Sequence, residues 1–197
     1  MKLERKYWLL MAVNGLAALG FTAWYIAIAN FEFMIYIGVV IFFMGLIFFT
    51  RNKVDYAMPV LWGLTIWALL HMSGGTFMIG EVRLYDFIFI PIVGEPYNVL
   101  RFDQLIHAFG FGATTLVAYH LMKPHLLDGT ARGKGSLLLV LALAGMGAGS
   151  VNEIVEFLIT VVNETSGVGG YINNSVDLIA NATGATIAAT YVYLRGE

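Results

Sequence analysis

Residues 147–157 read GAGSVNEIVEF and lie inside a stretch that otherwise has the composition of a membrane-spanning helix. Glu153 and Glu156 are three residues apart, so both side chains project from one face of that helix. A charged side chain at the centre of a bilayer costs roughly 2.5–3.5 kcal/mol on insertion scales, so two of them require partners. The partners must come from other helices, and they constrain how the helices pack.

The composition is that of a membrane protein. The chain has 197 residues, of which 59% are hydrophobic and 12% are charged, and its mean hydropathy is +0.77. Soluble domains contain roughly 25% charged residues. A net charge of −2 gives no basic excess for nucleic-acid binding, and the lack of cysteine excludes disulfides and zinc–thiolate sites. We therefore expect residues 1–197 to form a single transmembrane bundle.

Six apolar segments are long enough to span a bilayer, which predicts an all-α polytopic membrane protein. The segments cover residues 7–29, 31–50, 57–79, 103–122, 135–162 and 172–194. The longest connection, 80–102, is too apolar for a solvated linker and contains two prolines. We expect it to lie along the outer membrane surface, with Tyr85 and Tyr97 at the level of the headgroups.

The positions of lysine and arginine predict the orientation, because positive residues concentrate in cytoplasmic loops. If both termini are inside, only Arg83 and Arg101 lie outside. The residues that then lie inside are Lys2, Arg5, Lys6, Arg51, Lys53, Lys123, Arg132, Lys134 and Arg195. The predicted topology is therefore N-in and C-in.

Polar side chains in four of the predicted helices are candidates for one shared site. They are His71, Asp103, His107, Glu153, Glu156, Asn173, Asp177 and Asn181. Asp103 and His107 are four residues apart, as are Asp177 and Asn181, so each pair lies on one face of its helix. Helices of alternating direction bring all of these residues to the outer half of the bilayer.

The expected depths of these side chains agree. Glu156 lies roughly 9 Å and Glu153 roughly 14 Å below the outer end of the fifth span, and His71 lies roughly 12 Å below the end of the third. Glycines on the same faces, among them Gly149 and Gly184, allow the helices to approach closely. The pattern predicts a polar cavity that opens toward the outer leaflet.

Two histidines and four carboxylates at one depth suggest a divalent metal site. Imidazole and carboxylate ligands suit zinc, manganese or iron. The predicted metal ligands are His71, His107, Glu153 and Asp177. The predicted catalytic residues are Glu156, as general base or further ligand, and Asp103, which would orient the ligands. Asn173 and Asn181 would support them from outside the ligand set.

Two other interpretations remain open, and so does the question whether the chain is an enzyme. The same groups would suit a small proton- or cation-coupled transporter, although six helices are few for a transporter unless the chain forms a homo-oligomer. They would also suit a hydrogen-bonded network in a non-catalytic membrane partner protein, with some carboxylates neutral. Four acids without an intramembrane lysine or arginine favour a functional site over a structural one.

Three motifs, DQLIH at 103–107, EIVE at 153–156 and DLIANATG at 177–184, resemble in order and spacing the pattern of VanZ-like membrane proteins. Glu156 stands where that family has glutamine. The stretch from HMSGG at 71–75 through EVRL at 81–84 to His107 is similar to the YjdF group of bacterial inner-membrane proteins. These resemblances cover about residues 68–190 and imply a multi-pass protein of a prokaryotic cytoplasmic (inner) membrane.

The functional hypothesis that follows is metal-assisted hydrolysis or group transfer in the outer half of the membrane. The partners it requires are membrane lipids and a lipid or lipid-linked envelope substrate.

Overall fold

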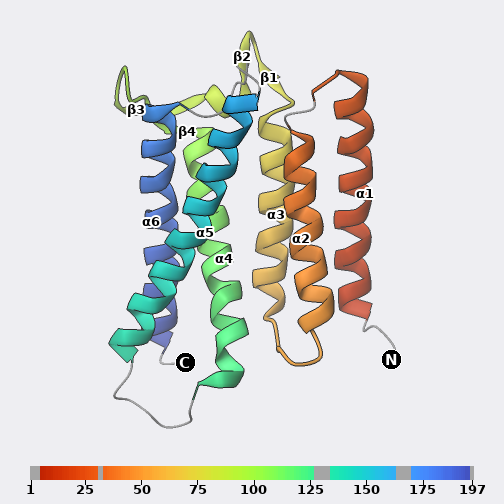
Figure 1. Ribbon diagram of the computed structural model, residues 1–197, viewed down its shortest axis with the longest axis vertical. Helices are drawn as coiled ribbons and strands as arrows, with labels where there is room; N and C mark the ends of the chain where they lie inside the picture. Colours follow the sequence, from red (N-terminus) through yellow and green to blue (C-terminus); the bar gives the residue numbers. More distant parts are fainter. Residues whose placement is uncertain (1–4, 31–32, 127–133, 163–169, 196–197) are drawn as a thin grey trace.

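The computed structural model shows six α-helices that run side by side (Figure 1). It describes residues 5–30, 33–126, 134–162 and 170–195, and the helix count concerns these ranges. The helices are α1 (Arg5–Ala27), α2 (Met34–Thr50), α3 (Met58–Gly74), α4 (Phe102–Met122), α5 (Lys134–Val162) and α6 (Tyr171–Arg195). Each one occupies a predicted apolar segment, so the helical class of the sequence-based prediction is confirmed.

Three stretches of helix are long and apolar enough to cross a membrane, namely Arg5–Ala27, Phe102–His125 and Gly135–Val161. Helices α2 and α3 are apolar but have 17 residues each, which corresponds to about 25 Å, against about 30 Å for a hydrocarbon core. The beginning of α1 and the end of α6 lie at the same end of the bundle (Figure 1), as the predicted topology requires. The six spans and their orientation stay predictions.

The connection between α3 and α4 folds into two β-hairpins. Strand β1 (Met78–Ile79) pairs with β2 (Val82–Arg83), and β3 (Ile88–Val93) pairs with β4 (Val99–Arg101), both antiparallel. A 3-10 turn, η1 (Leu84–Asp86), lies between the hairpins, and a second, η2 (Lys123–His125), follows α4. We call the end of the bundle that carries the strands the hairpin end (Figure 1).

The hairpins correct two of the sequence-based expectations. The predicted span 57–79 is wrong at its end, since the helix stops at Gly74, where two consecutive glycines weaken it. Gly80, with φ of +63°, then reverses the chain between β1 and β2. Tyr85 is not a headgroup anchor, because its side chain is 6% exposed and packs inside the protein, whereas Tyr97 is exposed as expected.

Helix α4 packs against α3, α5 and α6. Glycine makes the contact with α6 close, because a Cβ at Gly184 would collide with the backbone carbonyl of Ala108 on α4. Gly149 of α5 lies against the side chain of Asn181 of α6 in the same way. These small residues bring the polar faces of α4, α5 and α6 within hydrogen-bonding distance of one another.

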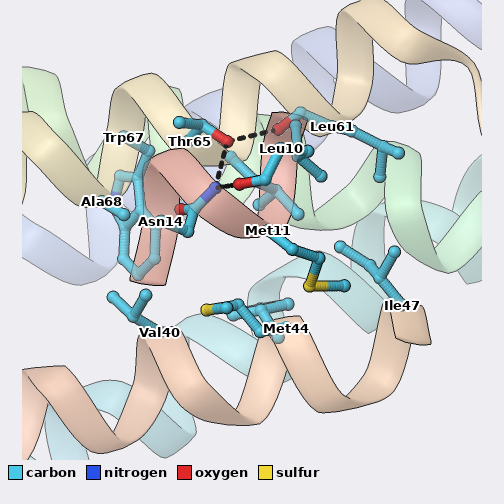
Figure 2. Close-up of a pocket in the computed structure, with 12 residues that line it drawn as sticks. Leu10, Met11, Asn14, Val40, Met44, Ile47, Leu61, Thr65, Trp67 and Ala68 are labelled. Carbon is cyan, nitrogen blue, oxygen red and sulfur yellow. Dashed lines mark hydrogen bonds between the residues drawn. The ribbon is translucent and has the colours of Figure 1, made fainter. Parts of the chain in front are cut away.

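Helices α1, α2 and α3 surround a small cavity of about 20 Å³ on the other side of the bundle (Figures 1 and 2). At its edge the Asn14 amide donates to Oγ1 of Thr65 at 2.8 Å and to the carbonyl of Leu10 at 2.9 Å. The Thr65 hydroxyl in turn donates to the carbonyl of Leu61. These hydrogen bonds join α1 to α3 independently of the acidic residues on α4, α5 and α6.

Candidate functional site

His107 of α4 is surrounded by polar side chains from three helices. Its side chain is 2% exposed, and its neighbours are buried apart from Asp103, whose side chain is 18% exposed. The neighbours are Asp103 on α4, Glu153 and Glu156 on α5, and Asp177 and Asn181 on α6. We call these six residues the His107 cluster. The predicted convergence of the fourth, fifth and sixth helices is therefore present in the structure.

One ring nitrogen of His107 faces an amide and a carboxylate. Nδ1 lies 3.0 Å from Oδ1 of Asn181 and 3.2 Å from Oε1 of Glu153. The Asn181 amide also donates through Nδ2 to the same Glu153 oxygen at 3.0 Å. Asn181 thus bridges α4 and α5 from α6, and it fixes the orientation of the imidazole ring.

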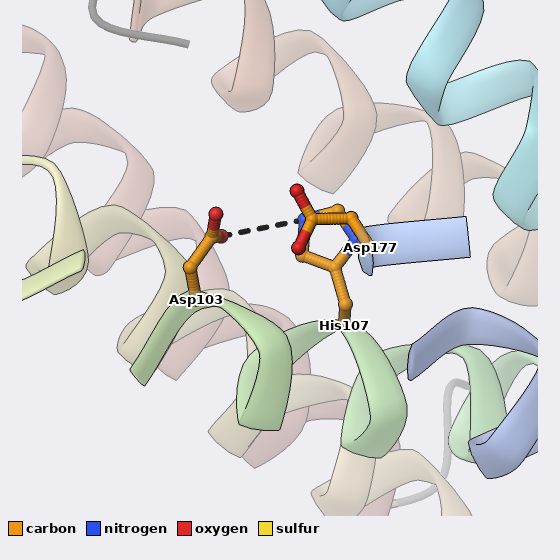
Figure 3. A group of neighbouring side chains, drawn as sticks. All are labelled: Asp103, His107 and Asp177. Atoms are coloured by element: carbon orange, nitrogen blue, oxygen red, sulfur yellow. Dashed lines mark ion pairs between the residues drawn. The ribbon is translucent and has the colours of Figure 1, made fainter. Parts of the chain in front are cut away.

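The other ring nitrogen faces two carboxyl groups. Nε2 of His107 lies 3.4 Å from Oδ1 of Asp103 and 3.8 Å from Oε1 of Glu156. Figure 3 shows the pair of Asp103 and His107, with Asp177 of α6 beside the ring. Ligand atoms of Asp103, His107 and Asp177 all lie within 4.8 Å of one another, as do ligand atoms of His107, Glu153 and Glu156. Either group has the size of a metal-binding site.

Several buried polar atoms near this cluster have no hydrogen-bond partner among the described residues. They include Oε2 of Glu153, Oδ1 of Asp177 and Nε2 of His71. Buried polar atoms in folded proteins are almost always hydrogen-bonded or bound to an ion or water. Three such atoms, on three different helices, are therefore positions where a water molecule, a proton or a bound ion could satisfy the site.

His71 lies outside both groups of potential ligands. Its Nδ1 is 2.7 Å from the hydroxyl of Tyr85, which also donates to the backbone carbonyl of His71 at 2.8 Å. Because the single hydroxyl proton is used on the carbonyl, Nδ1 is the donor in the other bond, and Nε2 carries a lone pair. The ring also stacks on Trp67 and meets Tyr36 edge-on. Its predicted role as a ligand stays a prediction.

Tyr85 is a contributor that the sequence reasoning missed. Burial raises the pKa of its hydroxyl well above the ordinary value, and the negative charge of Asp103 raises it further. The hydroxyl therefore stays protonated and remains a donor. No motif marks this tyrosine, because only the fold of the α3–α4 connection brings it to His71.

Asparagines support the acids of α5 and α6. Asn173 donates to Oδ2 of Asp177, and Asn152 donates to Oε1 of Glu156 at 2.8 Å. Asn173 was among the predicted site residues, whereas Asn152 was missed, although its spacing of four residues from Glu156 is a readable signal.

The ion pairs found among the described residues join the acids of the cluster only to His107. Arg101, the nearest arginine in the sequence, pairs instead with Asp86 at 3.6 Å, and Arg83 pairs with the same carboxylate at 3.4 Å. The acids of the cluster therefore receive their neutralisation from His107, from protons or from a bound cation.

Apolar helices around a buried group of histidine and carboxylates define a helical membrane protein with a polar internal site. Residues 7–197 match the family model described as "Predicted membrane protein (DUF2238)", so the chain belongs to that family. No curated protein and no solved structure matches the chain. The family match does not confirm the VanZ-like or YjdF-like resemblance, which stays a prediction.

Proposed function

We propose that the His107 cluster binds one divalent metal ion and uses it for hydrolysis or group transfer on a lipid or lipid-linked envelope molecule. The observation that carries the proposal is the group formed by Asp103, His107 and Asp177, whose ligand atoms lie within 4.8 Å of one another while Oδ1 of Asp177 has no partner among the described residues. Zinc, manganese and iron are the ions that suit imidazole and carboxylate ligands.

The spacing of the group supports this proposal. Ligand atoms bound at about 2.1 Å to a tetrahedral metal lie about 3.4 Å from one another. Nε2 of His107 and Oδ1 of Asp103 are 3.4 Å apart. A histidine that binds metal usually donates its other N–H to a carboxylate or carbonyl group, and Nδ1 of His107 faces Asn181 and Glu153 in this way.

Charge also supports a cation at this position. Four ionised carboxylates around a neutral imidazole, the form that binds metal, place four negative charges in a buried site, and each uncompensated buried charge costs several kcal/mol. A divalent ion would neutralise two of these charges without requiring a lysine or arginine, and protons on the remaining carboxyl groups would neutralise the rest.

The geometry favours a division of roles that differs in part from the sequence-based one. Asp103, His107 and Asp177 would be the ligands, because they form one group. Glu153 would orient His107 through Nδ1. Glu156, 3.8 Å from Nε2, would be the general base or a further ligand. The amides of Asn173 and Asn181 would hold Asp177 and His107 in place.

The proposal includes a setting in a prokaryotic inner membrane, with six spans and both termini in the cytoplasm. It is supported by the common end at which α1 begins and α6 ends and by the distribution of lysine and arginine. The motif order of VanZ-like proteins agrees with the placement of the site on α4, α5 and α6.

Metal content tests the binding step. The untagged protein is purified in detergent, loaded with Zn²⁺ or Mn²⁺, desalted and measured by mass spectrometry, beside Asp103→Asn, Asp177→Asn and the control Glu81→Gln. Glu81 is an exposed acid between β1 and β2. We expect about one ion per chain in the wild type and the control, and loss in the two site variants. A folded wild type without bound metal would overturn the proposal.

The reaction is tested by incubating metal-loaded protein with a total bacterial lipid extract and comparing lipids by mass spectrometry. Turnover that disappears on chelation and in Glu156→Gln supports the chemistry. A conversion that is unchanged in Glu156→Gln removes the assignment of Glu156 as the base.

A specific observation supports a second candidate, a proton- or cation-coupled transporter. Each ring nitrogen of His107 faces a carboxylate, Glu153 at Nδ1 and Asp103 at Nε2, which is an arrangement that can pass a proton from one carboxylate to another. Flux into proteoliposomes that follows a pH or cation gradient, without bound metal, would favour this function.

A further inference from the structure

A second feature of the fold is a cavity of about 560 Å³ between α5 and α6, which lies within the range of roughly 300–1,000 Å³ common for small-molecule sites. Its lining includes the polar residues Ser150, Glu153, Thr160, Tyr171, Asn174 and Ser175. It also includes Ile154, Phe157 and Leu178, whose apolar side chains are exposed on the surface of the bundle. The cavity is therefore amphipathic and begins where lipid tails would contact the protein.

The cavity reaches the His107 cluster through Glu153. This side chain is 4% exposed and lines the cavity. Its Oε1 is engaged by His107 and Asn181, whereas Oε2 has no hydrogen-bond partner among the described residues. The cavity and the His107 cluster therefore share the side chain of Glu153, which also orients the central histidine through Oε1.

The serine and threonine hydroxyls of the lining act mainly as acceptors. Ser150 donates to the carbonyl of Met146, Thr160 to that of Phe157, and Ser175 to that of Tyr171. Each hydroxyl has one proton, so these bonds leave only its lone pairs for a ligand. The three hydroxyls therefore offer acceptor atoms that suit a ligand with hydroxyl donors.

The charge of the cavity disfavours an anionic ligand. No lysine or arginine is among the described residues that line it, and Glu153 contributes a carboxylate. The Tyr171 hydroxyl and the second amide proton of Asn174 are donors in the lining, but a phosphate would lie near the carboxylate of Glu153 with no lysine or arginine to compensate its charge, which carries a desolvation cost. This also disfavours zwitterionic lipids, since their amine is attached to a phosphate.

We propose that the cavity between α5 and α6 binds a lipid with a neutral, hydroxyl-bearing head group, of the diacylglycerol or glycosyl-diacylglycerol class. The hydroxyls donate to Ser150 and Ser175, and the acyl chains lie along Ile154 and Phe157. The inference names the substrate class of the proposed function and rests on that function for the link to chemistry, but binding itself requires no metal.

The test is photolabelling of the full chain in nanodiscs. The probes are diacylglycerol, phosphatidate and phosphatidylethanolamine that carry the same photoreactive acyl chain, and labelled peptides are mapped by mass spectrometry. All labelling reactions contain EDTA, so lipid binding is measured without metal. Metal binding is measured separately from the metal content of the protein, so failure of one can be distinguished from failure of the other.

We expect diacylglycerol to label α5 and α6 peptides around 150–160 and 170–178, and phosphatidate to label them roughly tenfold less. The double variant Ser150→Ala/Ser175→Ala should reduce labelling roughly three- to tenfold. Thr183→Val is the matched control, because Thr183 makes the same bond to its own helix, to the carbonyl of Ile179, outside this cavity. If the double variant does not fold, Ser175→Val alone replaces it.

Three outcomes would overturn the proposal. Labelling of these peptides by phosphatidate or phosphatidylethanolamine that is as strong as labelling by diacylglycerol contradicts the assignment of a neutral head group. Labelling confined to other helices contradicts the location. Labelling of α5 and α6 that survives loss of both serine hydroxyls contradicts the role of the acceptors.

Discussion

Asn181→Leu tests the Asn181 bridge between α4, α5 and α6. It separates the effect of the bridge on metal binding from its effect on the stability of the bundle. Asn181 makes two buried hydrogen bonds, to Nδ1 of His107 and to Oε1 of Glu153, both at 3.0 Å. Leucine has the same number of side-chain heavy atoms and makes neither bond. Interhelical hydrogen bonds in membranes contribute about 0.6 kcal/mol on average and up to about 1.7. Loss of both should therefore lower the free energy of unfolding by about 1–3 kcal/mol.

The same substitution should weaken metal binding by roughly 10- to 100-fold, the usual effect of removing a residue that orients a metal ligand. The assay is a titration of the untagged protein with Mn²⁺ or Zn²⁺, combined with a denaturant unfolding curve in the same detergent. Together they report affinity and stability on one sample.

Asn14→Leu is the matched control. Asn14 is also a buried asparagine with two hydrogen bonds, to Thr65 and to the carbonyl of Leu10, and it lies among α1, α2 and α3 (Figure 2). It should lose a comparable amount of stability and keep its metal affinity. The reasoning is refuted if Asn181→Leu binds metal as tightly as the wild type, or if Asn14→Leu loses affinity to the same extent.

Further predictions concern packing and the hairpin end. Gly184→Ala should lower the melting temperature, because its Cβ collides with the carbonyl of Ala108, whereas Gly147→Ala, with no neighbour in the way, should not; equal melting temperatures would contradict the close packing. Tyr85→Phe should destabilise the fold by about 1–2 kcal/mol in denaturant unfolding, since it removes both bonds to His71, and an unchanged unfolding curve would show that these bonds contribute nothing. The pKa of Tyr85 is raised by burial, so the stability that rests on this group is fully present below about pH 10 and is lost as the pH rises further; Tyr85→Phe should flatten that loss in a melting series.

The sequence was sufficient to predict the helices and the meeting of the acidic motifs. DQLIH at 103–107 and DLIAN at 177–181 place polar pairs one turn apart, and EIVE at 153–156 supplies the third face. Alternating helix directions then place the three faces at one depth. This part was predictable because it depends only on helical periodicity, segment length and the cost of isolated charge in a bilayer.

The allocation of roles within the cluster was not predictable. Which carboxylate faces Nδ1 and which faces Nε2 of His107 depends on how each helix is rotated about its own axis. Gly149 and Gly184 set that rotation through contacts with other helices, and their spacing alone does not reveal it. As a result Glu153, predicted as a ligand, lies on the Nδ1 side, and Asp103 lies on the Nε2 side.

The structure of the α3–α4 connection could not be predicted for a different reason. The apolar residues of this connection fit a membrane-surface loop and a pair of short hairpins equally well. Only the fold brings Tyr85 into the interior against His71. Hydrophobicity alone does not distinguish a side chain buried in protein from one buried in lipid.

Electron spin echo spectroscopy of the Mn²⁺-loaded, untagged protein tests the central claim most directly, because modulation from a bound imidazole nitrogen reports a histidine ligand. The account predicts one strongly coupled nitrogen that disappears in His107→Gln and persists in His125→Gln, whose histidine lies in η2 after α4. Bound Mn²⁺ without a coupled nitrogen, or a signal that persists in His107→Gln, would contradict a metal site centred on His107.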